Sequence, residues 1–127
     1  MLLNMKRRSQ PTHDRMVSQI AQRLRDLEGY KKVQADLPAY TKPDTIYWSS
    51  GGGHIPDVTA WNNIFHIFEV ETDDSIDDAH TDDQWKLFAA YAAKFNAVFY
   101  AVVPRGYKWK TELQLTKLNI TAEVIEI

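Results

Sequence analysis

The sequence predicts a single α/β domain in which a helix and three strands are followed by a helix, a strand, and a final helix and strand. Apolar residues recur at helical spacing in residues 12–29, and two further helical segments follow at 82–95 and 107–118. Short runs of β-branched and aromatic residues separate these helices. A chain of 127 residues has room for one core of ordinary size. We therefore expect an αβββαβ core with a C-terminal αβ extension, and one domain over residues 1–127.

The first helix is predicted over residues 12–29. Thr12 is a candidate N-cap and Gly29 a candidate stop. The residues before it, 1–11, are basic and predict a flexible N-terminus. The apolar face of this helix is formed by Val17, Ile20, Ala21, Leu24 and Leu27.

Three strands are predicted in the middle of the chain. Residues 30–37 suit the first, and the next begins either near residues 45–48 or only after the triple glycine at 51–53. The segment VTAWNNIFHIF reads as a hairpin, because β-branched and aromatic residues flank Asn62 and Asn63. Asparagine tolerates the positive φ angles that tight hairpin turns demand.

Helices and strands alternate in the C-terminal half. A helix is predicted from about Asp82 to Phe95, with Thr81 before it. Residues 97–103 are a continuous apolar run of strand length, as expected for a strand that is covered on both faces. A last helix over about 107–118 precedes the alternating segment TAEVIEI, which suits an edge strand.

Three acidic residues are expected to converge at this hairpin. Asp57 precedes its first strand and therefore comes close to Glu69 on its second strand. Because strand side chains alternate between faces, Glu69 and Glu71 point the same way and Val70 points the opposite way. Carboxylates this close repel one another unless a cation neutralises them. The sequence thus predicts a site for a hard cation, Mg²⁺ or Mn²⁺.

The Pro-Asp pair at 56–57, followed by Glu69–Glu71, resembles the motif of the PD-(D/E)XK, or restriction endonuclease-like, nuclease superfamily. The chain departs from that motif at Glu71, where family members carry the lysine that positions or activates the attacking water. Some restriction enzymes of the superfamily also have an acid there. The resemblance covers about residues 12–103. It implies a mixed central sheet flanked by helices and metal-dependent hydrolysis of phosphodiester bonds, with DNA as the expected substrate.

Roles for individual residues follow from this resemblance. Asp57 and Glu69 would hold Mg²⁺, the backbone carbonyl of Val70 would be a further ligand, and Glu71 would orient or deprotonate the attacking water. Superfamily members often bring an acid from the first helix toward the metal, which makes Glu28 a secondary metal ligand. The alternative for Glu28 is an ordinary exposed helix residue.

Gln84 has two interpretations. It heads an aromatic stripe on its helix and resembles the Gln-x-x-x-Tyr element that several nucleases of the superfamily use beside the metal, although Phe88 stands at the tyrosine position. Alternatively, Thr81 and Gln84 form a capping box. For the histidines, His54 is a candidate contact to phosphate or metal-bound water, and the alternating pattern favours a buried, hydrogen-bonded His66.

The near-neutral net charge of −2 conceals strong segregation along the chain. Residues 1–42 hold nine Lys and Arg against four Asp and Glu; residues 43–83 hold none against ten; residues 84–127 hold six against three. An acidic metal pocket beside basic, phosphate-holding residues is what a nuclease needs. Solvated helix faces are the alternative. The candidate phosphate contacts are Lys6, Arg7, Arg8, Arg23, Arg25, Lys31, Lys32, Lys108 and Lys110.

The chain has no Cys and no apolar run near the length of a membrane span, so we expect a cytoplasmic protein without a membrane partner. Cutting both strands of a duplex with one site per chain generally requires two copies. A homodimer is therefore the candidate assembly, with the terminal strand or the Tyr107 and Trp109 region as its interface. A catalytically inactive module of the same fold, for nucleic-acid binding or protein assembly, is the alternative function.

Overall fold

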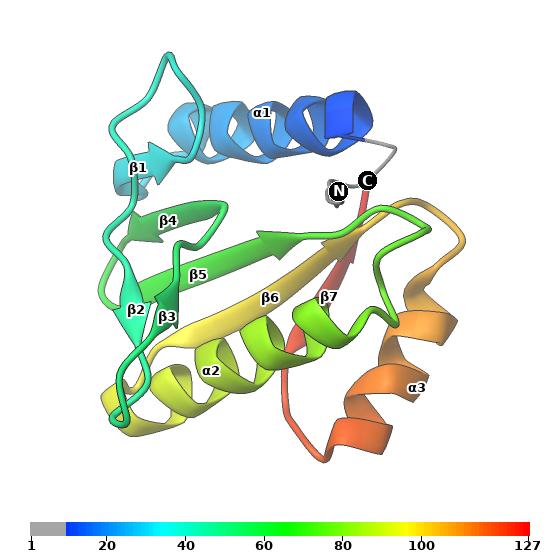
Figure 1. Cartoon of the computed structure of the whole chain (residues 1–127). Helices are drawn as coiled ribbons and strands as arrows, with labels where there is room; N and C mark the ends of the chain where they lie inside the picture. Colours follow the sequence, from blue (N-terminus) through cyan, green and yellow to red (C-terminus); the bar gives the residue numbers. More distant parts are fainter. Residues whose placement is uncertain (1–9) are drawn as a thin grey trace.

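The computed structural model describes residues 10–127, which form a mixed five-stranded sheet with helices on both faces (Figure 1). The strand order is β1–β4–β5–β6–β7. The first three strands in this order pair antiparallel, and β6 and β7 run parallel to β5. The predicted α/β class and mixed sheet are confirmed. The strands are β1 (Lys31–Ala35), β4 (Val58–Trp61), β5 (Phe65–Val70), β6 (Val98–Val103) and β7 (Glu123–Glu126).

Helix α1 (Gln10–Asp26) covers one face of the sheet, and helices α2 (Ala79–Phe95) and α3 (Lys108–Leu118) cover the other (Figure 1). Each of the last two helices connects a pair of parallel strands, because parallel neighbours need a crossover connection. The predicted order of a helix, three sheet strands, a helix, a strand, and a further helix and strand is therefore correct.

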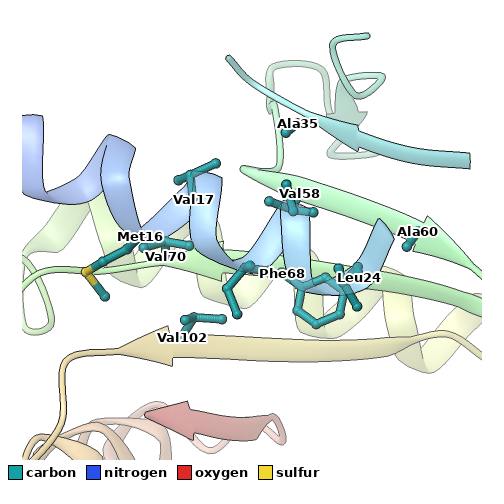
Figure 2. Packing of buried hydrophobic residues seen from close by; sticks show 11 residues of the cluster. Met16, Val17, Leu24, Ala35, Val58, Ala60, Phe68, Val70 and Val102 are labelled. Atoms are coloured by element: carbon teal, nitrogen blue, oxygen red, sulfur yellow. The ribbon is translucent and has the colours of Figure 1, made fainter. Parts of the chain in front are cut away.

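Alternation along the strands divides the apolar core into two layers. Phe68 and Val70 of β5 pack against α1, together with Val58 of β4 (Figure 2). Ile67, one position away from Phe68, packs instead with α2 residues such as Phe88. The opposite orientation of Val70 and its acidic neighbours, which the sequence predicts from a period of two, follows the same division.

The predicted hairpin is correct, although its turn works differently from the prediction. Val58 lies opposite Phe68, and Trp61 lies opposite Phe65. Asn62 does not adopt a positive φ angle, and neither does Asn63. The Asn62 side-chain oxygen instead accepts hydrogen bonds from the backbone N–H groups of residues 63 and 64, at 2.6 and 3.2 Å. A side-chain acceptor thus holds the turn that was expected to depend on backbone conformation.

Both candidate starts for the second strand are strands, but neither belongs to the main sheet. Strands β2 (Ile46–Tyr47) and β3 (Gly53–His54) form a separate antiparallel ribbon. A Cβ atom on Gly53 would lie 2.3 Å from the Ile46 carbonyl oxygen, so this close backbone approach requires glycine. The sheet strand itself begins only at Val58.

The ends of two helices differ from the predictions. Helix α1 begins at Gln10 rather than Thr12, so the last two residues of the expected flexible segment 1–11 are helical, and residues 1–9 lie outside the described part of the chain. Helix α2 begins at Ala79, and Asp78 caps it by accepting a hydrogen bond from the His80 N–H at 3.0 Å. Thr81 is therefore not the N-cap, because a carboxylate three residues earlier takes that position. No helix within residues 10–127 has the length and apolar character that crossing a membrane requires.

Candidate functional site

The predicted approach of Asp57 to Glu69 is confirmed by two hydrogen bonds. The Asp57 N–H donates to Glu69 Oε1 at 3.1 Å, and the Val70 N–H donates to Asp57 Oδ2 at 2.8 Å. Both acidic residues are buried. They meet because Asp57 directly precedes β4 and Glu69 is near the end of β5, its antiparallel neighbour.

His13 of α1 is a residue of this site that sequence reasoning missed. Its Nε2 lies 3.1 Å from Asp57 Oδ2, and its Nδ1 lies 3.1 Å from Asp14 Oδ1. The imidazole is buried and links the first turn of α1 to the acidic pair. The signal was present in the sequence, because His13 extends the buried stripe of Met16, Val17 and Ile20 by one helical turn.

Glu71 points to the same face as Glu69, as predicted, but its carboxylate is used elsewhere. Its Oε1 accepts hydrogen bonds from the hydroxyls of Ser75 at 2.7 Å and Thr81 at 3.2 Å. These contacts tie the end of β5 to the following loop and to the first turn of α2. Thr81, which was expected to cap the helix, is instead a buried donor to this acid. Of the three predicted acids, the structure therefore brings two together and gives the third a separate set of partners.

Asp57 and Glu69 line an open cleft of about 590 Å³ between the first turns of α1 and α2. Gln84 is buried at the cleft, and among residues 10–127 its Oε1 has no hydrogen-bond partner. The capping-box interpretation of Gln84 is wrong, because Asp78 is the N-cap. An amide oxygen without a partner in an acidic cleft favours the other interpretation, a role beside a ligand. The cleft is lined by Gln10, His13, Asp36, Ile55, Asp57, Glu69, Asp78, His80, Thr81 and Gln84.

Three further residues singled out in the sequence, Glu28, His54 and His66, are not among those that line the described cleft. Glu28 is exposed in the turn after α1, beyond the end of the helix opposite to His13. His54 Nε2 lies 2.6 Å from Asp83 Oδ2, and this hydrogen bond lowers the pKa of Asp83. The prediction for His66 is confirmed, since the ring is buried and contacts the Tyr100 hydroxyl at 2.9 Å.

The basic residues are mostly at the other end of the sheet. Lys31 lies opposite Trp61 at the hairpin end, whereas Ala35 lies opposite Val58 beside the acids. Arg23 and Arg25 are in the last turn of α1, away from His13. The predicted contacts Lys6, Arg7 and Arg8 lie outside the described residues. Lys108 and Lys110 belong to α3, where Lys110 Nζ lies 3.8 Å from Asp77.

The oxygen atoms that line the cleft suit a hard cation that is bound through few protein ligands. Within residues 10–127, no group of three or more His, Cys, Asp or Glu side chains is arranged to hold a metal ion. Mg²⁺, however, is commonly bound through only one or two carboxylates, with water and substrate phosphate completing its coordination. Asp57 and Glu69 supply two such carboxylates, and Gln84 adds an amide oxygen at the same cleft. These residues could hold Mg²⁺ that keeps several of its waters, but they do not form an all-protein cage.

No protein-family model, curated protein or solved structure matches this chain. The cleft and the acidic motif that lines it are therefore the features that bear on the function of this chain.

Proposed function

We propose that this chain is a metal-dependent nuclease of the restriction endonuclease-like fold, which hydrolyses phosphodiester bonds, with DNA as its substrate. The observation that carries the proposal is the contact between Asp57 and Glu69 in an open cleft. Two further features support it. The element order is the one that the motif resemblance implies, and Gln84 presents a buried amide oxygen at the same cleft.

Five residues receive roles in this proposal. Asp57 and Glu69 hold the ion, with the Val70 carbonyl as the further ligand that the resemblance implies. The bound ion would lower the pKa of a water and neutralise charge on the transferring phosphate. His13 fixes the Asp57 carboxylate through its 3.1 Å contact. Gln84 orients the attacking water or a phosphate oxygen.

Glu71 receives a different role from the one expected for it. Its Oε1 accepts from two hydroxyls, and it does not line the described cleft. We propose that Glu71 positions Gln84 indirectly. It holds Thr81 in the first turn of α2, and Gln84 follows three residues later on the same helix.

Cleavage of labelled DNA with Mg²⁺ or Mn²⁺ tests the proposal. Asp57→Asn and Glu69→Gln keep the shape of each side chain and remove its charge, so we expect both to abolish detectable cleavage. Glu28→Gln is the matched control, since this exposed acid lies at the far end of α1 and its removal should leave the rate unchanged. Equal cleavage by wild type, Asp57→Asn and Glu69→Gln would show that the activity comes from elsewhere.

A second candidate function is favoured by one observation. The motif lysine is replaced by Glu71, whose carboxylate is engaged in holding the loop and helix together. A non-catalytic module for nucleic-acid binding or assembly would have this property. Such a module predicts no affinity for a divalent ion at Asp57 and Glu69, whereas the nuclease requires that affinity.

A further inference from the structure

A groove lined by aromatic residues lies beside the acidic cleft, on the exposed side of α2. It is formed between α2 and the β2–β3 ribbon, which pack against each other (Figure 1), and its volume is about 430 Å³. Tyr47 and Phe95 are exposed by 68% and 56%, and they share one groove, whereas exposed apolar residues on their own need no explanation. The residues that define this aromatic groove are Tyr47, Trp48, Leu87, Tyr91, Lys94 and Phe95.

The rings form a continuous surface rather than isolated exposed residues. The ring centroids of Tyr91 and Phe95 are 4.5 Å apart, and those of Phe65 and Tyr91 are 6.2 Å apart. Phe65 continues this surface to Trp61, whose ring centroid is 4.9 Å away. Buried Leu87 belongs to the apolar core beneath the groove. Flat apolar faces are therefore held in place by the fold without a covering segment from residues 10–127.

The groove is connected to the cleft through one helix and one side chain. Gln84 and Tyr91 are seven residues apart on α2, which corresponds to about 10 Å along the helix axis. The Trp48 Nε1–H donates to Asp83 Oδ2 at 3.4 Å, and Asp83 directly precedes Gln84. A flexible polymer with a phosphate at Asp57 and Glu69 could therefore extend along α2 into the groove.

The charge and chemistry of the lining indicate an occupant. Lys94 is the only charged side chain that lines the described groove, and its Nζ lies 5.5 Å from the centroid of the Phe95 ring. Exposed flat rings beside a cation suit unpaired bases with their phosphates, because bases stack on aromatic faces and a lysine contacts the backbone. In a duplex, the faces of the bases are already stacked and cannot meet these rings.

We propose that the aromatic groove binds unpaired nucleotides of a single-stranded or splayed nucleic acid, by stacking bases on Tyr47, Tyr91 and Phe95 while Lys94 contacts the backbone. This inference rests on the proposed nuclease function and names its substrate class. The acidic cleft holds the phosphate that is cleaved, and the groove selects nucleic acid with exposed bases next to it.

Fluorescence anisotropy of a short labelled oligothymidylate, measured in EDTA so that no cleavage occurs, tests the inference. Phe95→Leu and Tyr47→Leu keep an apolar side chain and remove the ring. Each should weaken single-strand binding by at least about 5-fold, the lower end of the stacking contribution of one base. Trp109→Leu is the matched control, because Trp109 is 67% exposed on α3, outside the groove, and its loss should leave the affinity unchanged.

Three results would overturn the inference: unchanged binding by Phe95→Leu and Tyr47→Leu, an equal loss in Trp109→Leu, or a dimer in sedimentation that Phe95→Leu dissociates. The last result would assign the groove to a second copy of this chain. The binding and cleavage experiments distinguish a failure of the groove proposal from a failure of the nuclease proposal. A protein that cleaves DNA but binds single strands equally well after Phe95→Leu contradicts only the groove. Ring-dependent binding without any cleavage contradicts only the nuclease.

Discussion

Asp57 and Glu71, two acidic residues of the motif, have different surroundings. Asp57 is contacted by a backbone N–H and by the His13 imidazole, and it lines the cleft. Glu71 is fully buried and accepts from the hydroxyls of Ser75 and Thr81. A buried carboxylate is costly unless hydrogen bonds satisfy it, so these hydroxyls stabilise the fold as much as they define a site.

Ser75→Ala should therefore destabilise the protein. It removes a 2.7 Å donor from a buried carboxylate, and we expect the free energy of unfolding to fall by about 1–3 kcal/mol. Urea denaturation measures this change. Ser50→Ala, in an exposed turn, is the control and should have almost no effect. Equal stability of Ser75→Ala and wild type would mean that the hydroxyl does not support Glu71.

His66 is held as a neutral imidazole. Its Nε2 faces the Asn62 side-chain oxygen at 2.8 Å and therefore donates, while its Nδ1 accepts from the Tyr100 hydroxyl at 2.9 Å. Burial raises the pKa of Tyr100, which keeps that hydroxyl protonated as a donor. Burial also lowers the pKa of His66 from its ordinary value of 6.5.

This lowered pKa predicts a specific pH dependence. The unfolded chain binds the His66 proton more tightly than the folded chain, so stability is retained above 6.5 and lost as the pH falls below it. We expect the wild type to lose stability between about pH 8 and about pH 5 more steeply than His66→Gln, which cannot titrate. Urea midpoints across this range provide the test, and parallel curves would contradict the assignment.

At the residue scale, the sequence predicted the contact between Asp57 and Glu69, but it selected Glu28 from the first helical segment, whereas the structure places His13 of α1 against Asp57. The reason is physical. An amphipathic stripe defines which face of α1 is buried, and His13 lies on it, but the stripe does not tell which end of the helix meets the acids. Only the antiparallel register of β1 and β4, with Ala35 opposite Val58, decides that.

Among the elements, α2 contributes His80, Thr81 and Gln84 to the cleft, and the start of this helix depends on Asp78. This side chain accepts from the His80 N–H at 3.0 Å and satisfies a backbone donor that the helix leaves unpaired. Asp78→Ala should lower the free energy of unfolding by about 1 kcal/mol. Asp73→Ala, an exposed acid of the same loop, is the control, and thermal denaturation measures both. An equal effect of the two changes would show that the cap contributes nothing specific.

Long elements could be predicted from the sequence, and short ones could not. The apolar run that forms β6 and the β-branched and aromatic residues that form the hairpin strands reflect burial of these strands on both faces. Strands β2 and β3 have two residues each and show no period, so both segments remained alternatives for one strand. The start of α2 was missed because Asp78 and Thr81 are both good caps, and tertiary contact with Glu71 decides between them.

For the molecule as a whole, charge is partly separated along the sheet, and Lys110 of α3 is an exception because it lies beside the acidic loop, 3.8 Å from Asp77. The acids gather at the end where Asp57 follows the β2–β3 ribbon, and basic side chains such as Arg23 and Lys31 lie toward the hairpin end. Two surfaces remain candidates for the expected homodimer, the outer edge of β7 and the exposed Trp109 of α3. Both lie apart from the aromatic groove, so pairing there would leave the proposed base-binding surface accessible.

Calorimetric titration of the protein with Mn²⁺ tests the central claim most directly, because it requires neither the correct substrate nor catalysis. Wild type and Glu28→Gln should bind the ion alike, whereas Asp57→Asn and Glu69→Gln should lose binding, since each removes one of the two carboxylates that line the cleft. No binding by the wild type, or undiminished binding by both variants, would contradict the claim that these two acids form a divalent metal site.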